Sequence, residues 1–483
     1  MRKLIVSVVI VLLILFVAFG EELNILHMND FHGRLVPQVQ KVFKDYSYKV
    51  AGAEYISSII KHIREKEKNV ILFDAGDFSA GTIYSNLSQG QAVVDFYNYL
   101  GFDAIAVGNH EFDFGYDAFV NIAKKLNTNI LCANANPLFE GVKPFVIINK
   151  GNLKIAVVGL LTPETKIITM PNSLGGRDII DPVEALKKYE AQILRENPDL
   201  VVVLSHCGVK EDQRIANNVD YIDLIVGGHS HTELFEPIII SKPNKNVYIV
   251  QAGSYGKYIG HLKIDIQNRK IEKFNYKLYP TINAIIEPDT KVNEMISKYI
   301  KEAEKYSSQI IGISEVNMDK NSKEKELNLG TFITNVLAYV SDSDIAFYNH
   351  GGIRDVLRKG QISYGNIFDI LPFENTLVKF KMKGKDIIDL LNNMENKKTR
   401  LHYNDMLEKN NETWTLNGKP IEEDNYYTVC TVDFLYYGGD GYTEFSKYPV
   451  IQNYGYARDL IVKYIKENSP IKSSKVINKV VQK

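Results

Sequence analysis

The stretch Gly108-Asn109-His110-Glu111-Phe112-Asp113 follows directly after the short apolar run Ala104–Val107. A run of this length, bounded by turn-forming residues, is typical of a buried β-strand. Amide, imidazole and carboxylate side chains are therefore expected at the point where this strand ends. In open α/β sheets, ligands bind just beyond the carboxyl ends of the strands. The stretch predicts an α/β fold with a functional site at the strand ends.

The same pattern recurs after four more predicted strands in the first half of the chain. Leu23–Met28 precedes Asn29-Asp30-Phe31-His32, Val70–Phe73 precedes Asp74-Ala75-Gly76-Asp77, Leu200–Leu204 precedes Ser205-His206, and Leu224–Val226 precedes Gly227-Gly228-His229-Ser230-His231. Further strands are predicted at Lys154–Val158 and Tyr248–Gln251, and helices at Gly52–Arg64 and Val183–Arg195. Alternating strands and helices favour an α/β sandwich.

Five of the ten histidines of the chain fall at these strand ends: His32, His110, His206, His229 and His231. The other five, His27, His62, His261, His350 and His402, do not, and we interpret them as ordinary core or surface histidines. Such clustering at separate strand ends indicates a shared site.

The polar residues at the strand ends are those that bind transition metals. Residues i and i+2 of an extended segment point to the same side, so Asp30 should converge with His32, and His229 with His231. Carboxylate and imidazole are ligands of divalent transition metals. Two such ions about 3.5–4 Å apart can clamp a phosphoryl oxygen and activate a water. We therefore predict two divalent ions, Zn, Mn, Co or similar. Glycines that would allow tight turns and close approach are Gly76, Gly108, Gly227 and Gly228.

Composition limits the classes of function. The chain has 483 residues and a formal net charge of −1, so two domains are expected, and no strong charge favours a nucleic acid polymer or an acidic membrane surface. The three cysteines are far apart and are interpreted as small buried residues.

The first twenty residues have the pattern of a secretory signal peptide. Arg2 and Lys3 precede the apolar run Leu4–Phe19, and small residues near Gly20 offer a cleavage point. This predicts an exported protein, periplasmic or extracellular, with no stable membrane insertion after cleavage. An uncleaved membrane anchor remains the alternative.

The second half of the chain begins with a predicted connecting helix. Apolar residues recur at helical spacing over Asp289–Tyr306, and Asp289 is a suitable N-cap. The expected domains are 1–20 (signal peptide), 21–285 (catalytic), 286–308 (linker helix) and 309–483 (substrate binding).

Three stretches of the second half carry nucleotide-binding residue types. Asn349-His350-Gly351-Gly352-Ile353-Arg354 follows the strand-like run Ile345–Tyr348, and Arg354 offers a fork for phosphate. Leu371-Pro372-Phe373 and Phe434-Leu435-Tyr436-Tyr437-Gly438-Gly439-Asp440-Gly441 offer aromatic rings for a base and a carboxylate for ribose. Taken singly, each stretch also fits plain packing or a turn.

Taken together, the strand-end motifs resemble the calcineurin-like metallophosphoesterase superfamily. Their order and extent resemble the bacterial periplasmic 5′-nucleotidase/UDP-sugar hydrolase family over nearly the whole mature chain. The resemblance implies an N-terminal four-layer αββα sandwich, a connecting helix and a C-terminal α/β nucleotide-binding domain.

The resemblance also implies roles for individual residues. Asp30, His32 and His231 would hold one metal, Asn109, His206 and His229 the other, and Asp77 would bridge them. His110 would face the scissile phosphate, with Asp113 orienting it. In the second domain, Asn349 would contact the base, Arg354 phosphate and ribose, Phe373 and Phe434 the faces of the base, and Asp440 the ribose.

The expected activity is metal-dependent hydrolysis of nucleoside 5′-monophosphates, with nucleoside diphosphates and nucleotide sugars as further candidate substrates. The alternatives are a 2′,3′-cyclic-nucleotide phosphodiesterase and a surface binding protein whose catalytic site has decayed. Two departures from the family pattern bear on the substrate: His350 stands where relatives usually have a third Gly, and Lys323 and Lys325 stand where relatives often have Arg. The native metal, the preferred base and the oligomeric state remain open.

Overall fold

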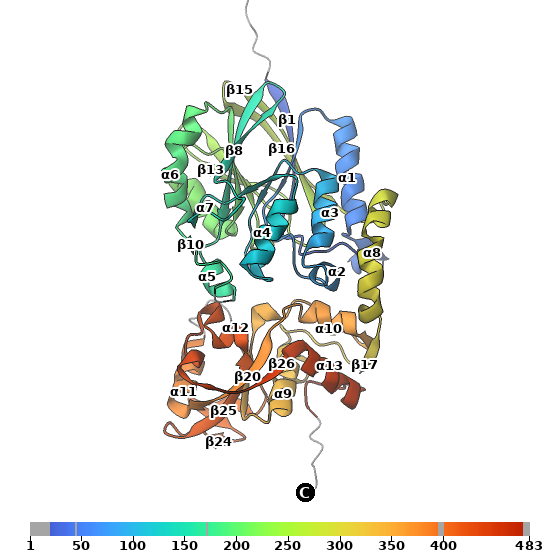
Figure 1. Cartoon of the computed structure of the whole chain (residues 1–483), viewed down its shortest axis with the longest axis vertical. Helices are drawn as coiled ribbons and strands as arrows, with labels where there is room; N and C mark the ends of the chain where they lie inside the picture. Colours follow the sequence, from blue (N-terminus) through green and yellow to red (C-terminus); the bar gives the residue numbers. More distant parts are fainter. Residues whose placement is uncertain (1–19, 44–45, 171, 395–399, 477–483) are drawn as a thin grey trace, which may run out of the picture.

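Two α/β blocks lie end to end in the computed structural model, which describes residues 20–43, 46–170, 172–394 and 400–476 (Figure 1). The first block spans residues 20–280 and the second residues 310–476, and helix α8 (Thr290–Ser307) connects them along one side of the molecule. Residues 1–19, where a signal peptide is predicted, lie outside the described part.

The first block contains two six-stranded sheets. One has the order β16-β15-β1-β4-β5-β6, with bounds Lys270–Pro280, Tyr258–Gln267, Glu21–Met28, Val70–Asp74, Ala104–Ala106 and Asn129–Leu131. The other has the order β13-β14-β12-β11-β9-β8, with bounds Ile238–Ser241, Asn246–Val250, Leu224–Gly227, Leu200–His206, Leu153–Leu161 and Phe145–Lys150. The inner strands of each sheet are parallel, so their carboxyl ends meet at one edge.

Side-chain alternation along the strands explains how the two sheets pack. In β1, Leu23 and Ile25 join an apolar core with Val202 and Leu204 of the other sheet, whereas Leu26 faces the helices. Helices α1 (Ala53–Lys66), α3 (Gln91–Leu100) and α4 (Tyr116–Lys125) cover the first sheet, and α6 (Pro182–Arg195) and α7 (Val209–Asn218) cover the second. The predicted four-layer αββα sandwich is confirmed.

The second block is built on a five-stranded sheet of order β21-β18-β25-β20-β26, with bounds Leu401–Tyr403, Ile345–Asn349, Tyr426–Val432, Thr376–Lys383 and Val450–Tyr456. Its longer helices are α9 (Leu329–Ser341), α10 (Tyr364–Ile370), α11 (Gly384–Asn393) and α13 (Ala457–Asn468). One apolar core joins sheet and helices.

Helix α8 packs against both blocks. Its N-cap is Asp289, as predicted, and the carboxylate accepts a hydrogen bond from the N–H of Lys291 at 3.1 Å. Val292 and Ile296 complete the core of the first block, while Ala303 near the other end packs against Phe368 of α10. The helix therefore sets how the two blocks face each other.

The three cysteines are buried and free, as expected. Within the described ranges, no helix has both the length and the apolar composition needed to cross a membrane.

Candidate active site

The seven predicted metal ligands gather where the carboxyl ends of the strands of both sheets meet. His32, after β1, and His231, after β12, bring their Nε2 atoms to 3.2 Å of each other. The Oδ1 atom of Asp30 lies 3.2 Å from His231 Nε2 and 4.0 Å from His32 Nε2. These three side chains form one group of potential ligands.

A second group lies beside the first. The Nε2 atom of His206, at the end of β11, is 3.1 Å from Asp77 Oδ2 and 3.2 Å from Asn109 Oδ1. His229 belongs to the same group, since its ligand atom lies within 4.8 Å of those of Asp77 and His206. The Oδ2 atom of Asp77 is also 3.8 Å from His32 Nε2, so this carboxylate lies between the groups, where a bridging ligand would be needed.

The backbone at these residues is not extended. The φ angles of Asp30, His32, Asp77, His229 and His231 are +50°, +49°, +59°, +71° and +53°. The left-handed region costs a non-glycine residue about 1–2 kcal/mol, and such strain is typical of functional sites. The paired residues do converge, but our expectation that they do so from extended segments is wrong. Gly76, at φ +93°, is needed sterically, because a Cβ there would lie 2.8 Å from the N atom of Gly108.

The donor atoms suit two divalent transition ions. Carbonyl oxygens hold the Nδ1 atoms of two histidines, Ala80 O for His32 at 3.2 Å and Ala75 O for His206 at 2.7 Å, which leaves Nε2 of each facing the cluster. Burial lowers the pKa of His32 well below its usual value and that of His229 to about 4, so both imidazoles are neutral, as ligands must be.

The local field of the cluster favours a cation. Although burial opposes it, the carboxylate of Asp77 raises the pKa of His206 to about 10. A positive charge at this position, whether a proton or a metal, is therefore stabilised by Asp77. Carboxylate and amide oxygens together with imidazole nitrogens complete a donor set that fits the expected metals.

Glu111 supports the cluster from behind, a role that the sequence interpretation missed. Its buried carboxylate accepts hydrogen bonds from the N–H groups of Asp77 (2.9 Å), Gly108 (2.7 Å), Phe78 (2.9 Å) and Ser79 (3.1 Å). Burial and then Asp77 raise the pKa of Glu111 to about 7. The sequence did offer a signal for this role, because Glu111 lies within the stretch 108–113 that follows a predicted strand.

His110 lies beside both groups, and its ring contacts Asp113. Its Nδ1 atom is 2.9 Å from Asp113 Oδ2 and 3.1 Å from Oδ1, and its backbone N–H donates to Asp77 Oδ1 at 2.8 Å. Burial lowers the pKa of His110, but Asp113 and then Asp77 outweigh it, so that the pKa is raised. Its second ring nitrogen can therefore carry a proton toward a ligand.

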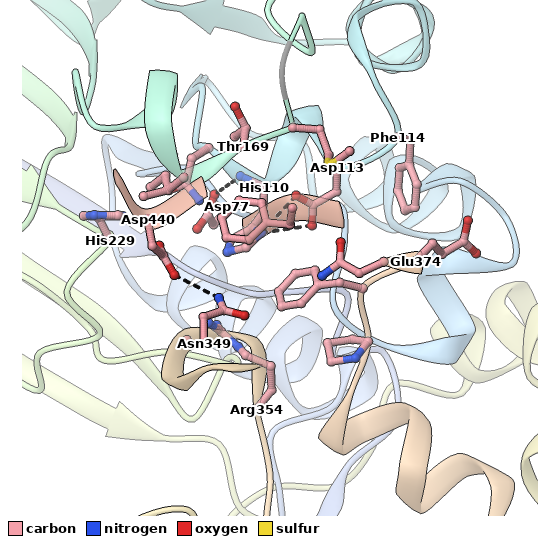
Figure 2. A pocket seen from close by; sticks show the side chains of 18 of the residues that line it. Asp77, His110, Asp113, Phe114, Thr169, His229, Asn349, Arg354, Glu374 and Asp440 are labelled. Atoms are coloured by element: carbon pink, nitrogen blue, oxygen red, sulfur yellow. Dashed lines mark hydrogen bonds and ion pairs between the residues drawn. The ribbon is translucent and has the colours of Figure 1, made fainter. Parts of the chain in front are cut away.

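One cavity of about 440 Å³ lies between the two blocks and joins the predicted catalytic and substrate residues. All fourteen predicted site residues line it except Asp30, His32 and His206, which belong to the metal groups just described. Figure 2 shows Asn349 and Arg354 approaching from one side and His110 with Asp77 from the other.

The predicted substrate residues of the second block contact one another and the first block. The amide of Asn349 donates to Asp440 Oδ2 at 2.9 Å (Figure 2). Phe373 stacks on the imidazole of His110, with ring centroids 5.4 Å apart and an interplanar angle of 14°. In this conformation Phe373 thus contacts the candidate catalytic residue His110, a contact that the predicted base sandwich with Phe434 did not anticipate.

The two lysines that we noted where the resemblance implies arginines do not line the cavity. Lys323 and Lys325 are exposed, and Lys325 pairs with Glu408 at 2.7 Å; neither is among the described residues that line the cavity. Lys320 instead donates to the carbonyl oxygens of His350 (3.2 Å) and Ile353, and so braces the loop before Arg354.

His350, where the sequence resemblance led us to expect a glycine, has a partner at the back of this loop. Nδ1 of His350 lies 3.0 Å from Nε2 of the buried His402, so one imidazole donates to the other. The interpretation of both residues as structural histidines agrees with this contact.

Comparison with known proteins agrees with the geometry. Residues 23–233 match the calcineurin-like phosphoesterase family and residues 308–447 match the 5′-nucleotidase C-terminal domain. A snake venom 5′-nucleotidase from Naja atra is 31% identical over 76% of this chain and 76% of its own length. A 5′-nucleotidase from Vibrio vulnificus is 28% identical over 94% and 92%. The crystal structure of a 5′-nucleotidase precursor from Thermus thermophilus superposes with a TM-score of 0.85 at 25% identity, covering 94% and 98%.

The sandwich, with its clustered ligands and a second domain facing them, defines a hydrolase of the metallophosphoesterase class. The chain belongs to the 5′-nucleotidase family, as the sequence motifs implied.

Proposed function

We propose that this enzyme hydrolyses nucleoside 5′-monophosphates to nucleoside and phosphate. The observation that carries the proposal is the shared cavity, in which potential ligands for two metals face Asn349, Arg354 and Asp440 of the second block. A volume of about 440 Å³ is within the range of small-molecule sites. Nucleoside diphosphates and nucleotide sugars would use the same contacts and are further candidates.

Asp30, His32 and His231 would hold one ion, and Asn109, His206 and His229 the other, with Asp77 shared. When bound, two such ions polarise the phosphoryl group and lower the pKa of water. The chain itself supplies orientation and charge. A protonated His110, held by Asp113, donates toward the phosphoryl oxygens, where negative charge builds.

The second block would hold the leaving nucleoside. Arg354 offers a bidentate fork to the phosphate, and the Asn349–Asp440 pair offers polar atoms to base and ribose. Phe373 and Phe434 would provide stacking surfaces. Because these contacts come from another block, truncated substrates should lose turnover as well as affinity.

The proposal also covers export of the chain, the bounds of its functional units and the identity of the metals. The chain would be exported after cleavage near residue 20, and its functional units would be 21–285, 286–308 and 309–483. The ions would be Zn, Mn, Co or a similar metal. Two other functions remain candidates: cleavage of 2′,3′-cyclic nucleotides, and nucleotide binding without turnover.

A substrate panel tests the proposal. The metal-loaded protein is assayed for phosphate release from AMP, ADP, UDP-glucose and 2′,3′-cyclic AMP, and kcat/KM is expected to be highest for AMP. His110→Asn is the matched control, which should keep both metals yet lose about 10²-fold or more in turnover. A clear preference for the cyclic nucleotide would overturn the proposal in favour of a 2′,3′-cyclic-nucleotide phosphodiesterase. No turnover with two metals bound would overturn it in favour of a nucleotide-binding protein without activity.

A further inference from the structure

Tyr255 lies between the metal cluster and the second block. It follows β14 in the loop before β15, with a left-handed backbone at φ +60°. Its N–H donates to the carbonyl oxygen of Asp30 at 2.7 Å, which ties the strained residue to the loop that carries two potential metal ligands. A bulky residue held in this conformation is uncommon and points to a positional constraint.

The ring of Tyr255 packs against two histidines of the metal cluster and against Arg34, all of the first block. Its centroid is 5.5 Å from that of His32 and 5.6 Å from that of His231. The guanidinium of Arg34 lies 5.1 Å from the centroid, over the ring. Arg34 also forms an ion pair at 3.9 Å with Asp369 of α10, so the ring is clamped where the blocks meet.

The hydroxyl of Tyr255 faces Arg354, the phosphate-binding candidate of the second block. Burial would lower the pKa of Arg354, but the Tyr255 side chain beside the guanidinium and then Asp77 outweigh burial, so that the pKa is raised. The ring centroid of Phe373 lies 6.0 Å from the guanidinium carbon of Arg354. Arg354 thus crosses the cleft and is held by a residue of the metal-binding block.

We propose that Tyr255 is a positioning residue, whose hydroxyl holds the guanidinium of Arg354 above the metal cluster so that its remaining N–H groups meet the phosphate of the substrate. The inference rests on the proposed function, because it concerns the same cavity. An arginine side chain is long, and bidentate recognition requires its planar fork in one orientation. One hydrogen bond to the hydroxyl fixes this orientation and still leaves most of the five N–H donors available.

Tyr255→Phe tests the proposal, since it keeps the ring and removes only the hydroxyl. We expect kcat/KM for AMP to fall about tenfold, the usual scale for a lost hydrogen bond to a charged group. The affinity for inorganic phosphate, measured by calorimetry, should fall by a similar factor, whereas adenosine affinity and bound metal should not change. Tyr258→Phe, whose ring pairs with Phe235 at the start of β15, is the matched control and should resemble the wild type.

The Arg354→Ala background separates positioning from a structural role. If Tyr255 acts through Arg354, Tyr255→Phe should cause no further loss of phosphate affinity or of kcat/KM in this background. An equal loss in both backgrounds, or a Tyr255→Phe enzyme with wild-type phosphate affinity and kcat/KM, would overturn the proposal. A wild type that hydrolyses no nucleotide would refute the proposed function alone, because the phosphate affinities would still test Tyr255.

Discussion

Replacing Glu111 by glutamine tests how the loop that carries Asp77 is held. The carboxylate of Glu111 accepts hydrogen bonds from four backbone N–H groups, two at each oxygen, and is 0% exposed. Glutamine has nearly the same shape but replaces one oxygen by an NH₂ group. Two buried N–H groups, either those of Phe78 and Ser79 or those of Asp77 and Gly108, would then face a donor.

The expected cost follows from this count. A buried polar group left without a partner costs about 1–3 kcal/mol, so two such groups predict a loss of about 2–6 kcal/mol in the free energy of unfolding. A loss of this size is a large fraction of the about 5–15 kcal/mol by which most proteins are stable. Since Asp77 belongs to the affected loop, metal affinity should fall as well.

The loss in the free energy of unfolding is measured by urea unfolding of the metal-free protein. We choose pH 8 because the pKa of Glu111 in the folded protein is about 7, so that its carboxyl group is ionised. Glu140→Gln is the control, because Glu140 is exposed and forms an ion pair with the exposed Lys124, so that the free energy of unfolding of this variant should match that of the wild type. Metal content is determined in parallel. An unchanged free energy of unfolding in Glu111→Gln would refute the reasoning.

Three further changes probe other parts of the molecule. Asp77→Asn should lose both metals, because Asp77 lies between the two ligand groups; near-normal occupancy of both sites by elemental analysis would contradict its bridging role. Phe373→Ala and Phe434→Ala should each weaken AMP binding by about 1–3 kcal/mol while nearly sparing bis(p-nitrophenyl) phosphate hydrolysis, whereas equal losses on both substrates would mean that the rings are structural. Asp289→Ala should lower the free energy of unfolding by about 1 kcal/mol at neutral pH, as for a lost N-cap. Burial would raise the pKa of Asp289, but hydrogen bonds from Lys61, Ser57 and Tyr99 lower it to about 2, so the difference from the wild type should persist above pH 4 and shrink as the pH falls toward 2.

Much of the first block was predictable because its signals are local. The predicted strand Val70–Phe73 appears as β4 (Val70–Asp74), and Leu200–Leu204 as β11 (Leu200–His206). The outer strands β15 and β16 were missed. In β16 polar and apolar residues alternate over a largely exposed strand, so it lacks the continuous apolar run that marks the inner strands.

The metal candidates were predictable for a related reason. Asp30, His206 and His229 each lie at the end of an apolar strand or within two residues of it, and parallel strands bring such positions to one edge of a sheet. The local geometry was not predictable from spacing: φ angles of +50° at Asp30 and +71° at His229 depend on hydrogen bonds from neighbouring strands and loops.

The sequence by itself determined the inner strands, the connecting helix and the residue types at the strand ends, because each of these depends on neighbours along the chain. Only the tertiary structure decided how the two blocks meet. The stacking of Phe373 on His110 and the contact between Arg354 and Tyr255 join residues that are far apart in sequence. Such contacts depend on the packing of α8 against both blocks. The pattern of apolar residues within a single segment does not indicate that packing.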